Sequence, residues 1–169
     1  MRHSASDFRL TISVMNTEEI ARLVAENVRK CRSVTLELAE GLADEVMKEA
    51  KRIGVRAVCA VCDDGGNPKL VKCADGSFLA SYDIALGKAY TSVALKMTTK
   101  ELSRLALPGE SLYGIQNTNG GRIVIFGGGV PLRVGESIIG GFGVSGGTEE
   151  QDTYLGDYAL GVFSRISEI

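Results

Sequence analysis

A glycine-rich block near the C-terminus constrains the fold of this chain more than any other feature of its sequence. The chain has 21 glycines in 169 residues, where average usage predicts about 12. The excess lies mainly in residues 109–161, and its centre is the run from Ile138 to Asp152, IIGGFGVSGGTEEQD. We expect a buried strand over Ser137–Val144, a tight loop at Ser145–Gly147 and a helix that begins at Thr148.

Hydrophobic periodicity and turn residues divide the rest of the chain into further elements. Helices are expected at residues 16–30, 35–53, 79–97, 98–105 and 148–164. Strands are expected at residues 55–62, 69–73, 123–126, 130–134 and 137–144. Because short turns join neighbouring strands, the pattern predicts an α/β (α+β) protein with a five-stranded, mostly antiparallel sheet and flanking helices. The glycine turn at Gly127–Gly129 allows another group to approach the backbone closely. The turn is either only part of a hairpin, or a place where a ligand or another subunit contacts the backbone.

Composition and charge exclude several classes of function. The length suits a single domain, and a net charge of −2 without a basic stripe argues against nucleic-acid binding. No apolar run approaches the roughly 20 residues that a membrane-spanning helix needs. The apolar run at Leu10–Val14 is too short for a secretory signal. We therefore expect a cytoplasmic protein whose four cysteines are reduced.

Two of the cysteines, Cys59 and Cys62, have CxxC spacing inside the strand expected at residues 55–62. Strand residues three positions apart point to opposite faces of a sheet, and a structural zinc site needs a second pair of ligands. We interpret both cysteines as small buried hydrophobic residues, with a zinc or redox role as the alternative.

The start of the last helix offers either a helix cap or an anion site. Thr148 and Gln151 have the spacing of a capping box. Free backbone amides after Gly146 and Gly147 would suit a phosphate or carboxylate. Three acidic residues in the first turn would balance the helix dipole and repel an anion, so capping is the favoured interpretation.

Histidine-dependent chemistry has little support, because the one histidine of the chain is His3. A Ser-His or Cys-His pair and a histidine metal site are both excluded from the expected core. Acid or lysine chemistry stays open at residues such as Lys88 and Asp152, but their spacing singles out no pair.

Four sequence blocks together resemble the family of GlcG, HbpS and the PduO C-terminal domain, the haem-degrading domain family. The blocks are residues 63–66 (DDGG), 81–89 (SYDIALGKA), 128–132 (GGVPL) and 138–152 (IIGGFGVSGGTEEQD). The last block is the most specific, because its length and order are hard to obtain by chance. The resemblance covers about residues 35–163.

The resemblance implies a profilin-like fold, homo-oligomers, and binding of haem or a corrinoid-related ligand in several members. Some members are linked to bacterial microcompartments for diol or glycol use. The adenosyltransferase domain of full PduO proteins has no counterpart in this sequence, so that activity is not carried over. The motif positions and the glycine loop together give the ligand-binding candidates Lys88, Pro131, Ser145, Gly146, Gly147, Gln151 and Asp152.

The sequence departs from the family pattern at one position that matters for haem. The Asp-Gly-Gly turn is often followed by histidine in this family, whereas this chain has Asn67. Tyr82, Tyr90, Cys73 and Met97 have side chains of types that can ligate iron, but packing or surface roles suit them better. We expect haem to bind weakly or not at all, and we expect no metal site.

Residues 15–34 precede the expected core as an amphipathic helix and a linker. The apolar stripe of this helix consists of Ile20, Leu23, Val24 and Val28. The helix is similar to the encapsulation peptides of microcompartment cargo, which would bind a shell or cargo protein, and an ordinary packing helix is the alternative. Residues 1–14 are expected to be a flexible or edge segment, and the biological start is Met1 or Met15.

These features predict a small-ligand-binding protein of a bacterial microcompartment, with haem or a corrinoid as the candidate ligand. One alternative is an enzyme that acts on a small oxygenated metabolite through Lys88 and the helix start at Gly146 and Gly147. A ligand-free structural oligomer is the other.

Overall fold

The structure, a computed structural model, describes residues 33–167, so the expected segments at 1–14 and 16–30 lie outside the described residues. The helices are α3 (Leu36–Arg52), α4 (Ser81–Ala94), α5 (Thr99–Leu105) and α6 (Glu149–Ser167). The strands are β1 (Val58–Asp63), β2 (Pro68–Cys73), β3 (Gly129–Val134) and β4 (Ser137–Ser145). Two short 3₁₀ turns, η1 (Ile115–Asn117) and η2 (Asn119–Gly121), lie between α5 and β3.

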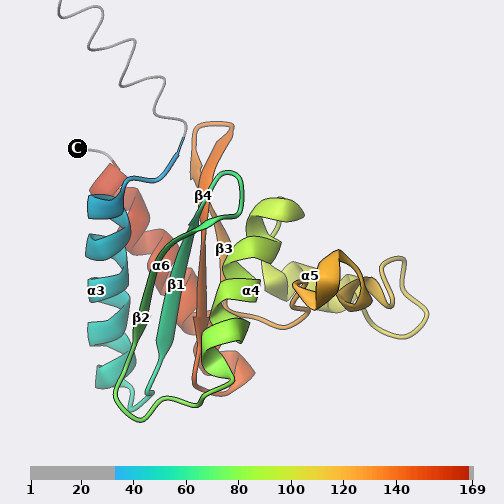
Figure 1. Cartoon of the computed structure of the whole chain (residues 1–169), viewed down its shortest axis with the longest axis horizontal. Helices are drawn as coiled ribbons and strands as arrows, with labels where there is room; N and C mark the ends of the chain where they lie inside the picture. Colours follow the sequence, from blue (N-terminus) through green and yellow to red (C-terminus); the bar gives the residue numbers. More distant parts are fainter. Residues whose placement is uncertain (1–32, 168–169) are drawn as a thin grey trace, which may run out of the picture. The chain divides into compact units, whose positions relative to one another are not determined.

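The four strands form one antiparallel sheet in the order β2-β1-β4-β3. Two hairpins, β1–β2 and β3–β4, pair through β1 and β4 at the centre. In Figure 1 the sheet lies between α4 on one side and α3 with α6 on the other. The predicted class, an antiparallel sheet with flanking helices, is therefore confirmed.

The predicted strand at residues 123–126 is wrong, and within residues 33–167 the sheet has four strands where five were expected. The strands expected at 123–126, 130–134 and 137–144 would have formed a three-stranded C-terminal unit, but only the last two pair, as the β3–β4 hairpin. The Val124 amide donates to Thr91 Oγ1 of α4 at 2.9 Å, so this backbone bonds to a helix side chain and not to a neighbouring strand. Pairing of β3 with β4 begins at Gly129, and β3 is an edge of the sheet.

The helix predicted at residues 35–53 is confirmed as α3. Its N-cap is Thr35, whose hydroxyl accepts from the Leu38 amide at 3.2 Å. Val34, the last residue of the predicted linker, is buried, and its amide donates to the Ile139 carbonyl at 2.7 Å. Val34 therefore belongs to the packed unit. No helix within residues 33–167 is both long and apolar enough to cross a membrane.

Strand β1 presents its side chains alternately to the two helical layers. Cys59 and Val61 belong to the core under α3 and α6, whereas Ala60 and Cys62 pack with α4. The two thiols therefore diverge, as the sequence predicts, and both are free. Burial raises the pKa of both, to about 11 for Cys62, so both are protonated at neutral pH.

The glycines of β4 set the distance between the sheet and α4. Phe142 and Val144 point into the core under α3 and α6, so Gly141 and Gly143 face α4. A Cβ atom on Gly143 would lie 2.1 Å from the Ala85 carbonyl oxygen of α4. Because no side chain separates the two backbones, α4 rests directly on β4 and its inward side chains enter the interior of the molecule.

Candidate functional site

Lys88 is the largest fully buried side chain among the described residues, and it is the centre of the candidate site. Its helix, α4, packs so closely on β4 that the side chain has no path to solvent. The ammonium nitrogen donates to Asp152 Oδ2 at 2.7 Å and to the Val144 carbonyl at 2.8 Å. The ring of Phe126 covers the ammonium, with its centroid 4.8 Å from the nitrogen.

Asp152 connects this buried lysine to the loop before α6. One carboxylate oxygen accepts from Lys88, and the other, Oδ1, accepts from the Gly147 amide at 2.9 Å. The capping box also forms. The Thr148 amide donates to Gln151 Oε1 at 2.9 Å, and the Gln151 amide donates to Thr148 Oγ1 at 3.3 Å. The loop amides at 147 and 148 thus already have side-chain acceptors, which favours capping over an anion at this position.

The electrostatics of the pair restrict its chemistry. Burial lowers the pKa of Lys88, while the carboxylates of Asp152 and Glu149 oppose that shift. An ammonium has three donors, and here two are hydrogen-bonded while an aromatic face covers the nitrogen. The arrangement holds the glycine loop in place and supplies a fixed local dipole, but it does not present a free amine for nucleophilic attack.

A pocket of about 300 Å³ opens above this pair. Its walls come from the chain before α4, from Phe126 and from the β4–α6 loop. The Ser145 hydroxyl donates to Ser81 Oγ at 3.1 Å, in buried surroundings. The lining residues are Phe78, Ala80, Ser81, Ile84, Phe126, Ser145, Gly146, Gly147, Glu149 and Asp152.

The structure brings most of the predicted site residues together. The candidates that line the pocket are Ser145, Gly146, Gly147 and Asp152. Lys88 lies beneath them and Gln151 caps α6, whereas Pro131 pairs with Gly141 inside the sheet and does not line the pocket. Sequence reasoning missed Ser81 and Phe126. Ser81 opens the block SYDIALGKA, which could have identified it, but Phe126 was assigned to a strand that does not form.

A family model described as "Haem degrading protein HbpS-like" matches residues 34–160. The chain belongs to the HbpS-like family. Its relatives include the 15.0 kDa protein of the dhaT-dhaS intergenic region of Citrobacter freundii, 46% identical over 79% of this chain and 94% of that protein. The corrinoid adenosyltransferase PduO of Salmonella typhimurium is 35% identical, but the match covers 70% of this chain and only 35% of PduO.

The fold of this HbpS-like chain is also that of a solved relative. A crystal structure of a PduOC–haem complex superimposes with a TM-score of 0.74 at 32% identity. The superposition covers 77% of this chain and 94% of the PduOC chain. The PduOC chain of that structure holds haem, so the fit of haem to this chain is tested residue by residue.

The pocket of this HbpS-like protein does not fit an iron-ligated haem. Haem iron is held by histidine, cysteine, methionine or tyrosine side chains, and none of these lines the pocket. The single histidine is His3, outside the described residues. Of the other candidates, Tyr90 is occupied elsewhere, with its hydroxyl accepting from Asn119 Nδ2 at 3.0 Å. The Asn67 side chain is likewise bound, because its amide donates to the Asp63 carboxylate at 3.2 Å.

Proposed function

We propose that this HbpS-like protein binds a small molecule in the pocket above Lys88 and Asp152. The observation that carries the proposal is a fully buried ion pair placed at a pocket and not in the middle of the core. A buried pair of charges carries a large desolvation cost, and a hydrophobic pair of similar volume would often stabilise the fold at least as well. Charged groups that are held beside a cavity, where they can contact a bound molecule, are a feature of binding sites.

The ligand that best suits the pocket is smaller than haem. A volume of about 300 Å³ is at the lower end of ligand sites, and the polar side chains are two serine hydroxyls and two carboxylates. Haem and corrinoids are the ligands that the relatives suggest, but the lining residues supply no iron ligand of the kinds that hold haem. A small oxygenated molecule would hydrogen-bond to these polar side chains and needs no metal ligand from the protein.

Thermal shift measurements test this proposal. A panel of small hydroxylated metabolites, haem and cobalamin is added to the full chain, and a binder raises Tm further as its concentration increases. We expect the response to be reduced in Ser145→Ala and unchanged in Ser103→Ala, a half-buried serine of α5 that does not line the pocket. The proposal is wrong if no compound raises Tm, or if Ser145→Ala responds as the original chain does.

An absorption spectrum addresses haem directly. We expect no saturable Soret shift at submicromolar haem, because the pocket offers no ligand for the iron. A shift of that affinity that persists after removal of residues 1–14, and hence of His3, would show that haem is the ligand after all.

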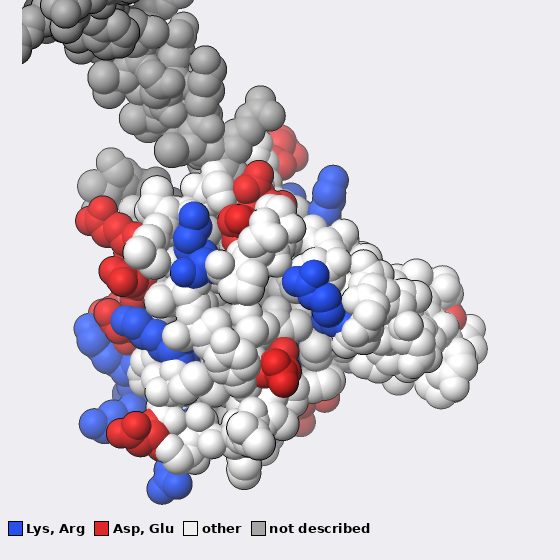
Figure 2. Space-filling view, viewed as in Figure 1, with Lys and Arg blue, Asp and Glu red and all other residues white. Residues whose placement is uncertain are grey.

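We also propose that the protein is a homo-oligomer associated with a bacterial microcompartment. Three large side chains near the start of α4 support the first part, since Phe78, Leu79 and Tyr82 are 72%, 94% and 46% exposed. Figure 2 shows few charged side chains over the middle of the face that α4 and β2 form. A homo-oligomer with closed symmetry would bury this exposed apolar surface between its subunits. Light scattering that finds only monomer at micromolar concentration would exclude the homo-oligomer.

The proposed association with a microcompartment rests on the apolar stripe of the helix expected within residues 15–34.

A further inference from the structure

We propose that a second pocket of this protein, around Arg122, binds molecules that carry a carboxylate beside a flat apolar group. This Arg122 pocket has a volume of about 330 Å³. Its lining residues are Cys62, Gly66, Pro68, Asp83, Leu86, Gly87, Gly121, Arg122 and Val124. The walls are mainly apolar, with one cation and one carboxylate among them.

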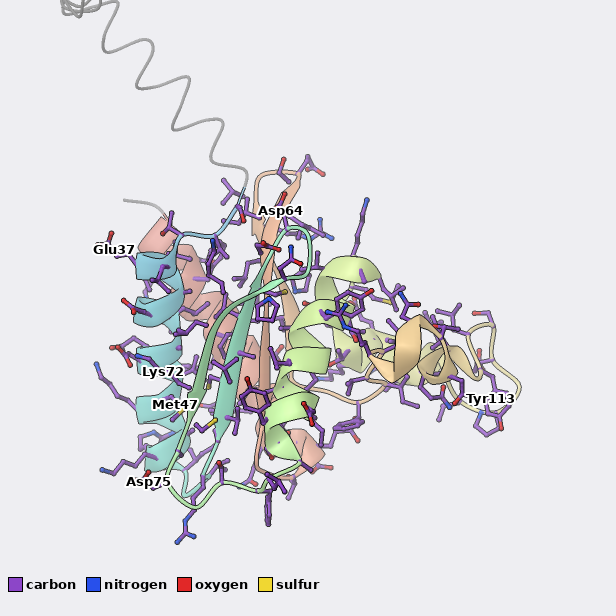
Figure 3. The ribbon with its side chains drawn as sticks, in the orientation of Figure 1. Glu37, Met47, Asp64, Lys72, Asp75 and Tyr113 are labelled. Atoms are coloured by element: carbon purple, nitrogen blue, oxygen red, sulfur yellow. The ribbon has the colours of Figure 1, made fainter. Side chains whose placement is uncertain are left out.

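The Arg122 pocket is separate from the pocket above Lys88 and Asp152, here called the Lys88 pocket, because the two have no lining residue in common. Ser145 of the Lys88 pocket pairs with Val58 at the start of β1, whereas Cys62 of the Arg122 pocket lies near the end of that strand. Four residues of strand correspond to about 13 Å. In Figure 3 the labels Asp64 and Asp75 mark the two ends of the β1–β2 hairpin. The proposal therefore does not rest on ligand binding at Lys88.

The guanidinium of Arg122 is fixed in position although it is exposed. Its central carbon lies 3.6 Å from the centre of the Tyr90 ring, which is a stacked arrangement. One nitrogen, Nη2, donates to the Gly66 carbonyl at 3.3 Å. That is the one side-chain hydrogen bond of Arg122 within residues 33–167. A guanidinium has five N–H donors, so most of its planar fork is free for a second, planar acceptor.

Tyr90, on which Arg122 stacks, is itself held from several directions. Its hydroxyl accepts from Asn119 Nδ2 at 3.0 Å, and Asn119 has a left-handed backbone with φ of 52°. Its ring packs so closely on the β1–β2 turn that a Cβ atom on Gly66, whose φ is +75°, would lie 2.8 Å from the ring. These contacts hold the Tyr90 ring in one position, and a preorganised side chain is a feature of binding sites.

The walls of the pocket select the kind of molecule. Leu86, Val124 and Pro68 offer apolar surface for a flat group, and burial keeps the Cys62 thiol protonated and uncharged by raising its pKa to about 11. Asp83 lines the same pocket and repels anions. Inorganic phosphate has no flat apolar group for these walls to contact, so the site favours a carboxylate on a flat group over free phosphate.

Benzoate, benzamide and inorganic phosphate are suitable probes, because benzamide has the shape of benzoate without its charge. Each is titrated into the full chain while the Gly66 and Val124 amide signals are followed by NMR. We expect saturable millimolar shifts with benzoate, and weaker ones with benzamide and phosphate. Arg122→Gln should weaken benzoate binding by at least about tenfold, since a charge-assisted bidentate pair is lost. Asp83→Asn should strengthen it.

Arg133→Gln is the matched control. Arg133 is another exposed arginine with a single backbone acceptor, the Lys96 carbonyl at 2.8 Å, and it lies outside the pocket. This variant should bind benzoate as the original chain does. Equal binding of benzamide and benzoate, full binding by Arg122→Gln, or no saturable shift at Gly66 would each overturn the proposal. Benzoate shifts confined to Gly147 would assign the binding to the Lys88 pocket and overturn it equally.

Discussion

Lys88 and Asp152 are 64 positions apart in the sequence and form the most deeply buried ion pair of the described residues. The two side chains are 0% and 5% exposed. The pair joins α4 to the first turn of α6 across the end of β4, and it fixes the Gly146-Gly147 loop through the second carboxylate oxygen. Stability and the shape of the pocket proposed to bind a ligand therefore depend on the same contact.

Replacement of one partner should be far more costly than replacement of both. Lys88→Met leaves the Asp152 carboxylate buried without its cation, so we expect the free energy of unfolding to fall by about 3–5 kcal/mol. The double variant Lys88→Met with Asp152→Leu should recover part of this loss, because no buried charge remains. Urea denaturation monitored by circular dichroism measures all three proteins.

The exposed pair Lys72–Asp44 provides the control for this experiment, with side chains 32% and 54% exposed and Lys72 labelled in Figure 3. Lys72→Met should change stability by no more than about 1 kcal/mol. Equal losses for Lys88→Met and Lys72→Met would contradict the role given to the buried pair.

The contact between α4 and β4 predicts opposite outcomes for two glycine-to-alanine changes. In Gly143→Ala the new Cβ atom would meet the Ala85 carbonyl oxygen at 2.1 Å, so the helix must move away from the strand. We expect a loss of at least about 3 kcal/mol, measured by thermal or urea unfolding. Gly41→Ala, in open space on α3, should instead stabilise the protein by about 0.5–1 kcal/mol. A tolerated Gly143→Ala would mean that the two layers are not in direct contact.

Glu49 predicts a specific loss of stability in acid. Hydrogen bonds from Arg52 and from the Tyr154 hydroxyl lower the pKa of this carboxyl from 4.5 to about 2. The folded state therefore binds the proton less readily than the unfolded state. The stabilising contribution is complete above pH 4.5 and is lost as the pH falls toward 2. We expect Tm to fall less steeply over this interval in Glu49→Gln than in the original chain, and parallel curves would disprove the assignment.

The segment before the described residues is predicted to act in targeting. Removal of residues 1–32 should leave Tm within a few degrees, because the core within residues 33–167 has its own caps and contacts. Replacement of Leu23 and Val24 by glutamate should abolish co-purification with microcompartments, whereas Glu26→Gln, off the apolar stripe, should not. The targeting role would be wrong if the truncated protein unfolds. It would also be wrong if a fluorescent protein fused to residues 15–32 stays diffuse in cells that make microcompartments. Either result would mean that the segment is an ordinary packing helix.

The sequence by itself determined the features that depend on neighbours along the chain. The helix over residues 35–53, the Thr148–Gln151 capping box and the opposite directions of Cys59 and Cys62 follow from spacing, because helix periodicity, helix caps and strand alternation are local geometry. The motif blocks also placed Ser145 and Asp152 in one site, since both lie within the same 15-residue run.

Only the tertiary structure decided the contacts between distant elements. The pairing of Lys88 with Asp152, the cover that Phe126 forms and the stacking of Arg122 on Tyr90 each join segments with no shared periodicity. The same reason explains the error at residues 123–126. A short apolar run can form a strand or an irregular segment with similar ease. Which of the two forms depends on whether its backbone amides bond to a neighbouring strand or to a side chain. Here the Val124 amide bonds to the Thr91 side chain.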